Sequence, residues 1–291
     1  MALTATQLAA FAAVARNGSV HAAADELRLT QPSVSAGVAG LSRVLGMPLL
    51  ERDGRGVRLT AAGRAFAPYA EEALGLVQQG TRAAREALQP EAARVRLIAV
   101  ATAGEFLAPA MLQAYRAVEP GTTVLLEVGN RRQVVDALRS RRADVGIGGR
   151  PPDRDIAGHP LIENDLVVVS ARPVPNLATV PWLLREEGSG TRATLETYLA
   201  EQGIAPPDQL TLGSNGAIRQ ALVLGLGATL ISRHAVSAEL RSGVLRLVRA
   251  PGTPIHRPFH VLVARTPPPR PAVAGLVSFL RSPAARAALA G

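Results

Sequence analysis

The sequence contains no cysteine, no lysine and no long apolar run. The absence of cysteine excludes disulfides, thiolate zinc sites and a cysteine nucleophile. No run approaches the roughly 20 apolar residues that a membrane-spanning helix needs, and residues 1–6 lack the basic start and apolar core of a signal peptide. We therefore expect a cytoplasmic protein with no membrane partner.

The positive charge is concentrated at one end of the chain. Residues 1–90 hold nine arginines against seven acidic residues, and residues 91–240 hold fifteen against sixteen. Residues 241–291 hold eight arginines and no acidic residue, which accounts for most of the net charge of +9. We interpret this segment as a solvated arginine-rich surface, with a second nucleic-acid site as the alternative. At 291 residues and 47% hydrophobic content, the chain has room for two or three domains.

Residues 19–41 show the pattern of two short helices joined by a tight turn. Ser19 is suited to cap the first helix and Thr30 the second, which we expect to end at Gly46. Pro32 fits the first turn of the second helix, where a missing N–H breaks no hydrogen bond. The buried face of this helix is an apolar stripe at helical spacing, formed by Val34, Val38, Leu41 and Leu45. Short polar side chains occupy the other face near the helix N-terminus, as in a helix-turn-helix that enters the DNA major groove.

Four ordered motifs resemble the LysR-type bacterial transcriptional regulators. They are Ala23-Ala24, Leu29-Thr-Gln-Pro-Ser-Val-Ser35, Gly46-Met-Pro-Leu-Leu-Glu-Arg52 and Val57-Arg-Leu-Thr-Ala-Ala-Gly63. The resemblance implies an α/β protein with three parts. These are a winged helix-turn-helix at 1–60, a long dimerising linker helix at 61–90, and an effector domain at 91–291 that is similar to periplasmic solute-binding proteins.

The predicted DNA contacts come from the helix pair and from a hairpin at residues 49–59, whose tip contains an Asp-Gly turn. Arginines of this hairpin are suited to meet phosphates or the minor groove, which supplies affinity rather than sequence reading. The predicted DNA-binding residues are His21, Thr30, Gln31, Pro32, Ser33, Ser35, Arg52, Arg55 and Arg58.

The second helix departs from the family pattern. Ala36, Gly37 and Ala39 stand where family members usually carry longer polar side chains, and Gly40 adds another small residue. Two interior glycines cost about 1 kcal/mol each relative to alanine. We expect base discrimination to depend on Gln31, Ser33 and Ser35 and on DNA shape, and to be shallower than in a typical relative. The alternative is a two-lobed small-molecule sensor whose DNA recognition is degraded or weakly specific.

Residues 60–89 read as one long amphipathic helix, with Phe66, Ala70, Val77 and Leu88 near heptad spacing. Such a helix needs a partner, and a second copy is the simplest one. A homodimer, or a homotetramer built from dimers, would place two reading helices about 34 Å apart on a partly palindromic operator.

From residue 94 onward the pattern alternates between strand and helix, with the first of these helices expected at 104–118. This alternation predicts mainly parallel sheets with helical crossovers. We expect two lobes, at 91–167 plus 266–291 and at 168–265. Ligands of such sheets lie at the carboxyl ends of strands, against helix N-termini. The predicted effector-binding residues are Thr102, Ala103, Gly104, Asn130, Ser189, Gly190, Thr191 and Asn215.

Backbone N–H groups and hydroxyls at these places favour a small anionic effector, most simply a carboxylate or phosphate. Val100 and Ala101 stand where relatives often have hydroxyl residues, so we expect a less polar pocket and doubt a highly charged effector. We predict no catalytic residue, no metal site and no cofactor. His256 and His260 share a face if they lie on a strand, but no third ligand is apparent.

Overall fold

The computed structural model describes residues 2–54, 56–89, 93–152 and 155–290. Contacts divide the chain into two compact units. The first comprises Met1–Leu88 with Arg139–Arg142, and the second comprises Gln89–Leu138 with Ala143–Gly291. Within the described residues, no helix is both long and apolar enough to cross a membrane.

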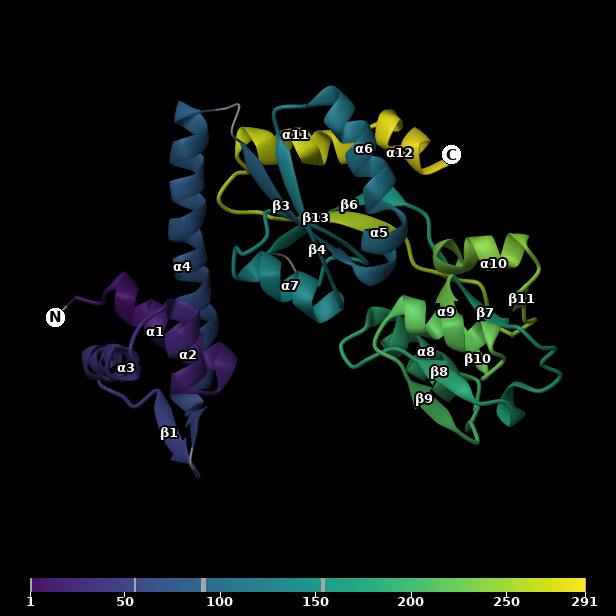
Figure 1. Ribbon diagram of the computed structural model, residues 1–291, viewed down its shortest axis with the longest axis horizontal. Helices are drawn as coiled ribbons and strands as arrows, with labels where there is room; N and C mark the ends of the chain where they lie inside the picture. Colours follow the sequence, from purple (N-terminus) through teal and green to yellow (C-terminus); the bar gives the residue numbers. More distant parts are fainter. Residues whose placement is uncertain (1, 55, 90–92, 153–154, 291) are drawn as a thin grey trace. The chain divides into compact units, whose positions relative to one another are not determined.

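The first unit holds three short helices, a hairpin and one long helix (Figure 1). The elements are α1 (Ala5–Asn17), α2 (Val20–Leu27), α3 (Gln31–Leu45), β1 (Leu50–Asp53), β2 (Gly56–Leu59) and α4 (Ala61–Leu88). Side chains of Ser19 and Thr30 cap α2 and α3 as predicted, because each accepts a hydrogen bond from a backbone N–H three residues later. Gly46 ends α3 in the left-handed conformation, with φ of 71°.

One apolar core joins the helices of this unit to the hairpin and to the start of α4. Phe11 of α1, Leu41 of α3 and Leu49 before β1 are fully buried in it. Phe66 of α4 packs on Phe11 with ring centroids 5.7 Å apart, and Ala70 is buried one turn later. The first turns of α4 therefore belong to the packing of the helix-turn-helix.

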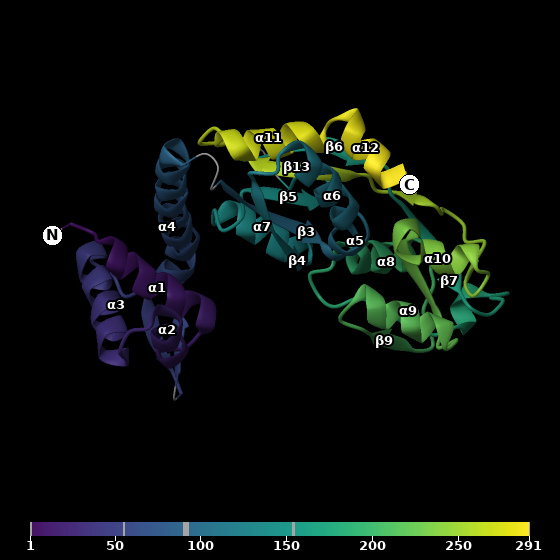
Figure 2. The same cartoon turned by 45° about the horizontal axis from the view of Figure 1, so that its top comes forward.

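The second unit is built around two sheets (Figure 2). We call the part around the first sheet lobe 1; its strands run in the order β4-β3-β5-β13-β6. Its elements are β3 (Arg94–Val100), α5 (Ala101–Phe106), α6 (Ala108–Val118), β4 (Thr123–Gly129), α7 (Arg131–Arg139), β5 (Val145–Gly148), β6 (Ile156–Ile162), β13 (Phe259–Ala264), α11 (Pro271–Leu280) and α12 (Pro283–Ala290).

Lobe 2 surrounds the second sheet, ordered β11-β7-β10-β8-β9, with β12 also paired to β7. Its elements are β7 (Asp165–Ser170), η2 (Leu177–Thr179), β8 (Trp182–Leu184), α8 (Gly190–Glu201), β9 (Gln209–Thr211), α9 (Asn215–Val223), β10 (Ala228–Ser232), η3 (Arg233–Val236), α10 (Ser237–Arg241), β11 (Arg246–Leu247) and β12 (Ile255–His256). The core of this lobe contains Trp182, which is fully buried and donates its indole N–H to the Leu177 carbonyl at 3.0 Å.

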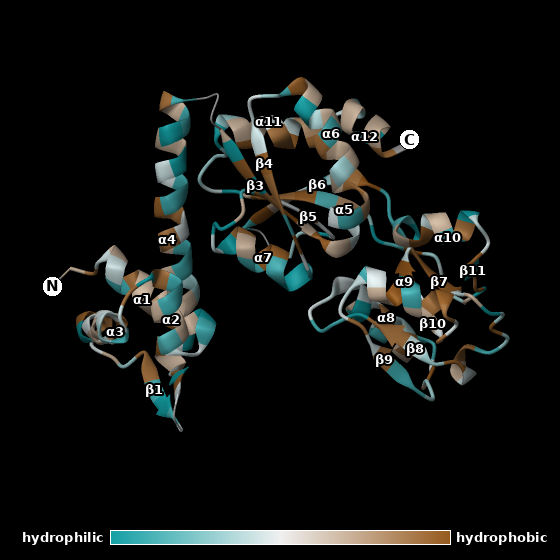
Figure 3. Ribbon diagram, in the orientation of Figure 1, coloured by the Kyte–Doolittle hydropathy of each residue, from teal (hydrophilic) through white to brown (hydrophobic). Residues whose placement is uncertain are grey.

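The chain crosses between the lobes twice, at residues 163–164 and 257–258. We expected residues 168–265 in the second lobe, but β13 pairs antiparallel with β5 and β6 of lobe 1. The reason is its sequence, since the inward-facing Val261 and neighbouring apolar residues complete the core of lobe 1. Figure 3 shows the apolar strands at the middle of both sheets.

Two further elements of lobe 1 differ from expectation. The helix predicted at 104–118 is divided into α5 and α6, because Pro109 lacks an N–H and opens a new helix. The strand β6 was not predicted, although it forms one edge of the sheet.

A buried ion pair ties the C-terminal segment to this sheet. Arg270, before α11, donates to Asp144 at 3.1 Å, and both side chains are at most 4% exposed. The same carboxylate oxygen accepts the backbone N–H of Arg96 on β3 at 2.9 Å. Removing one partner would deprive a buried charge of this ion pair, which is costly in a protein interior.

We predict that Asp144→Asn lowers the free energy of unfolding of the second unit by about 3–5 kcal/mol, measured by equilibrium urea unfolding. The matched control is Glu196→Gln, which breaks the half-exposed pair with Arg192 at 2.7 Å and should cost under about 1 kcal/mol. Equal, small losses in both variants would show that the buried pair does not hold the lobe together.

Candidate functional site

The predicted reading surface lies on exposed positions of α2 and α3. His21, Thr30, Gln31, Pro32, Ser33 and Ser35 are all exposed. The side-chain oxygen of Thr30 caps α3, because it accepts a hydrogen bond from the Ser33 N–H at 3.3 Å. Gln31 lies 3.0 Å from a ring nitrogen of His21, which fixes the amide of Gln31 at the start of α3.

The two glycines of α3 have a structural explanation that the sequence did not reveal. A Cβ on Gly37 would lie 2.9 Å from the Cβ of Ala10 in α1, and one on Gly40 would lie 2.7 Å from the side chain of Gln7. Both glycines therefore face α1 and permit a close approach of the two helices. Of the four small residues, Ala36 and Ala39 are the two that lie on the exposed face. Fewer positions on the DNA-facing side of α3 therefore lack a long polar side chain than the sequence pattern indicated.

The hairpin of β1 and β2 forms as predicted, with Asp53 paired to Gly56 beside its tip. Arg52 is exposed, and Arg58 is exposed but paired with Glu51 at 3.0 Å across the hairpin. Arg55 lies outside the described residues. Among the described residues Arg52 has no carboxylate partner, so its guanidinium is better placed for a phosphate than the paired one at Arg58.

The apolar positions of α4 separate into two sets. Phe66 and Ala70 pack on the unit's own core. Tyr69, Val77 and Leu88 are 71%, 64% and 84% exposed. Because the predicted heptad stripe included Phe66 and Ala70, the exposed apolar surface of α4 is shorter than the sequence pattern indicated.

A cavity lies between the lobes of the second unit. It holds about 570 Å³ of space free of atoms, partly open to solvent, of which about 60 Å³ can hold the centre of a water molecule. Because one water molecule needs about 10–15 Å³ of the latter space, the cavity accommodates a few water molecules or a compact ion. The walls come from lobe 1, lobe 2 and both crossing segments; among the lining residues are Thr102, Asn130, Arg131, Asn164, Arg185, Ser189, Gly190, Thr191 and Arg257.

Most predicted effector-binding residues reach this cavity, from both lobes. Thr102 in α5, Asn130 before α7, and Ser189, Gly190 and Thr191 at the start of α8 line it. Ser189 caps α8 by accepting the Arg192 N–H at 3.4 Å. Ala103 and Gly104 do not line the cavity. Both are buried, and a Cβ on Gly104 would meet Val128 of β4 at 2.7 Å.

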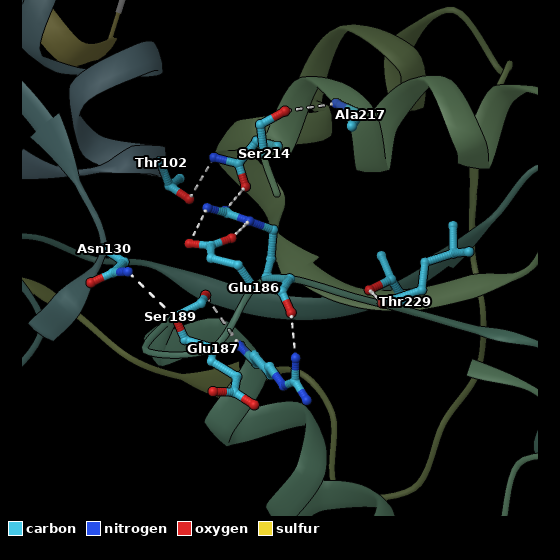
Figure 4. A network of polar contacts seen from close by, with 12 residues as sticks. Thr102, Asn130, Glu186, Glu187, Ser189, Ser214, Ala217 and Thr229 are labelled. Atoms are coloured by element: carbon cyan, nitrogen blue, oxygen red, sulfur yellow. Dashed lines mark hydrogen bonds and ion pairs between the residues drawn. The ribbon is translucent and has the colours of Figure 1, made fainter. Parts of the chain in front are cut away.

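Asn215 connects the two lobes beside the cavity. Its amide donates to Thr102 at 3.4 Å and to Glu105 at 3.2 Å, both in α5, and its carbonyl accepts from Arg185 at 2.5 Å. Figure 4 shows the part of this network around Thr102 and Glu186, together with Asn130, whose amide donates to the main-chain carbonyl of Glu187 in lobe 2 at 3.5 Å. The lobes are therefore in direct polar contact.

Three arginines in the cavity were missed by sequence reasoning. The charge of Arg185 is compensated by Glu186 at 2.8 Å. Arg257 donates to the main-chain carbonyl of Gly190 at 2.9 Å and to the hydroxyl of Thr194, and Arg131 donates to the carbonyl of Arg150 at 3.1 Å. Among the described residues, no carboxylate pairs with Arg131 or Arg257.

The electrostatics of the cavity are therefore positive. Burial lowers the pKa of Arg257 below its ordinary value, and the charges of Arg131 and Arg150 lower it further. We expected a less polar pocket because of Val100 and Ala101, which do line it. The expectation of a less polar pocket stays a prediction; the charged groups that do line the cavity are long side chains from distant elements.

His256 and His260, considered above as a metal pair, contact different groups. His256 on β12 contacts two carboxylates, whereas His260 on β13 contacts the main-chain carbonyl of Pro258. Within the described part of the chain, no group of three His, Cys, Asp or Glu side chains is arranged to hold a metal.

A winged helix-turn-helix in one chain with a two-lobed domain around a polar cavity defines a ligand-responsive DNA-binding protein. Comparison with known proteins gives the family. A model described as "LysR substrate binding domain" matches residues 88–285, and one described as "Bacterial regulatory helix-turn-helix protein, lysR family" matches residues 5–64. The chain belongs to the LysR family of transcriptional regulators.

Individual relatives agree with this family. The HTH-type transcriptional regulator CbbR of Rhodospirillum rubrum is 33% identical over 286 residues, covering 96% of each chain. Full-length OxyR from Pseudomonas aeruginosa has the same fold, with a TM-score of 0.64, 25% identity and coverage of 98% of this chain and 97% of that one. The regulatory domain of Synechocystis CcmR, solved with 2-PG, has a TM-score of 0.61 and 27% identity, and covers 65% of this chain and 96% of that one.

The protein is therefore a DNA-binding transcriptional regulator with an effector-binding domain, as its motifs predicted. It is not an enzyme, because the family and the relatives it matches are regulators of transcription.

We predict that Gly37→Ala destabilises the first unit, although alanine normally favours a helix by about 1 kcal/mol over glycine. The added methyl group would force α1 and α3 apart at Ala10. The matched control is Gly80→Ala on α4, where nothing lies within 4 Å of the new Cβ, and which should be neutral or stabilising. Thermal unfolding of both variants measures the difference; a stabilised Gly37→Ala variant would refute the close-packing explanation.

Proposed function

We propose that this regulator recognises a partly palindromic operator as a homodimer or a dimer of dimers, and that a small anion in the inter-lobe cavity controls this binding. The observation that carries the proposal is the pair Arg131 and Arg257, which face the cavity without a carboxylate partner among the described residues. Since its proposed partner is chromosomal DNA, we place the protein in the cytoplasm.

On DNA, the exposed side of α3 is the proposed reading surface. Gln31, Ser33 and Ser35 carry groups that hydrogen-bond base edges or phosphates, and the start of a helix also offers free N–H groups. Arg52 of the hairpin supplies phosphate affinity. The exposed stripe of Tyr69, Val77 and Leu88 on α4 supports pairing with a second copy.

In the cavity, the proposed effector is a carboxylate or phosphate compound. Arg257 and Arg131 supply charge, while Ser189, Gly190 and Thr191 supply a hydroxyl and N–H groups at the start of α8. The relative CcmR, whose regulatory domain binds 2-PG in its solved structure, supports a small ligand at the corresponding domain.

Control follows if the anion favours one arrangement of the lobes. Lobe 1 contributes Arg131, lobe 2 contributes Ser189, and Arg257 comes from a crossing segment, so an anion touching all three biases the lobe arrangement. Such coupling is reciprocal. Equal anion affinity for free and operator-bound protein would therefore rule it out.

A second function has one observation in its favour. Ala36 and Ala39 leave the middle of the exposed side of α3 without reading side chains. A two-lobed sensor with weakly specific DNA recognition would have the same feature. The two functions differ in the ratio of specific to nonspecific DNA affinity.

We predict that the protein binds its upstream intergenic DNA at least about a hundredfold more tightly than scrambled DNA, with affinity for both falling steeply as salt rises. Gln31→Ala should reduce the specific excess, whereas Arg52→Gln should weaken both complexes similarly. Fluorescence anisotropy at two salt concentrations measures these constants. Equal binding to both DNAs by the unmodified protein would favour the sensor.

We predict that Arg257→Gln weakens binding of sulfate, a probe that stays fully ionised near neutral pH, by about tenfold or more, as expected for a lost charge-assisted contact. The matched control is Arg246→Gln, which removes an exposed arginine of β11 outside the cavity. Isothermal titration calorimetry gives both affinities. Identical losses in the two variants would show general charge attraction rather than a site.

A further inference from the structure

A cluster of charged side chains lies beside the two crossing segments of the second unit. Neither the proposed DNA contacts nor the proposed anion contacts include it. His256 closes β12 and lies opposite Asp165 of β7 in the strand register. One ring nitrogen of His256 is 3.0 Å from the Asp165 carboxylate, and the other is 2.5 Å from the Glu163 carboxylate. The imidazole thus bridges the two strands at the point where they leave lobe 2.

Only the protonated His256 imidazole can donate a hydrogen bond to both carboxylates. A neutral imidazole has one N–H and one lone pair, so it can donate to only one carboxylate. The imidazolium donates from both nitrogens and satisfies both. The hydrogen bond to Asp165 first, and then the charges of Glu163 and Asp165, raise the pKa of His256 above its ordinary value. His234 of η3 also contacts Glu163, through its main-chain carbonyl at 3.0 Å.

The residue that follows His256 in the chain is Arg257, in the second crossing segment. Its guanidinium lies in the cavity, where burial and then the charges of Arg131 and Arg150 of lobe 1 lower its pKa. Its backbone is bonded to the other crossing segment: Asn164 accepts the Arg257 N–H at 2.8 Å and donates its amide to the Arg257 carbonyl at 3.0 Å. Any shift of β12 relative to β7 is therefore transmitted to Arg257.

We propose that His256 is a positioning residue for the anion site, which clamps the two crossing segments when protonated and so holds Arg257 in the cavity. The proposal rests on the proposed function, because it assumes that Arg257 binds the effector anion. The clamp is complete below the raised pKa of His256 and is lost as the pH rises through it. Anion affinity is then higher on the acidic side.

The test is calorimetric titration of the full-length protein with sulfate between about pH 5.5 and 8.5, since only the protein titrates in this range. Because the clamp is solvent-exposed, the wild-type affinity should fall by about two- to fivefold with rising pH. His256→Gln should show the lower affinity at every pH. His256→Arg, which keeps the positive charge, should keep the higher affinity at alkaline pH.

Three results are distinguishable. An unchanged pH dependence in His256→Gln overturns the positioning role while leaving the anion site intact, provided that Arg257→Gln still loses binding. Failure of the wild type to bind sulfate at any pH overturns both proposals. A pH-independent His256→Gln with restored alkaline affinity in His256→Arg supports the clamp.

A second readout does not depend on affinity measurements. Because coupling is reciprocal, saturating sulfate should raise the pKa of the His256 imidazole, followed by NMR of histidine side chains. His21, in the other unit, is the internal control and should not respond. A His256 pKa that stays constant with sulfate would overturn the proposal.

Discussion

The second unit depends on one buried amide. Asn164 is 4% exposed and lies where the chain first leaves lobe 1. Its main-chain carbonyl accepts the Arg257 N–H, and its side-chain amide donates to the Arg257 main-chain carbonyl in the other crossing segment. Its side-chain oxygen accepts a hydrogen bond from the Ser232 hydroxyl at 2.5 Å. A buried amide whose N–H and carbonyl groups are hydrogen-bonded favours a single arrangement of its partners. It holds the two crossings in a single register, on which the walls of the cavity depend.

The parts that sequence reasoning predicted well are those set by local chemistry. The caps at Ser19 and Thr30, the left-handed Gly46 and the hairpin beside Asp53 follow from residues a few positions apart. Local turn and cap preferences act over that range. The same is true of Ser189, whose cap of α8 also places it in the cavity.

What could not be predicted depends on contacts between distant residues. Arg257 follows a short strand and is separated by many residues from Arg131 and Gly190, so no spacing indicates that they share a cavity. Pairing of β13 with β5 and β6 is equally non-local. Gly37 illustrates the same limit in the first unit. Read alone it is a weak point in a helix, but the packing of Ala10 against it shows why a larger residue does not fit.

The burial of Trp182 has a spectroscopic consequence. It is the single tryptophan of the chain and lies in the core of lobe 2, with its ring 6.4 Å from that of Tyr198. Fluorescence excited at the red edge of the absorption band therefore reports on lobe 2 alone. Compared with circular dichroism, which sums over all the helices, this emission would reveal whether lobe 2 melts together with lobe 1 or as a separate cooperative unit.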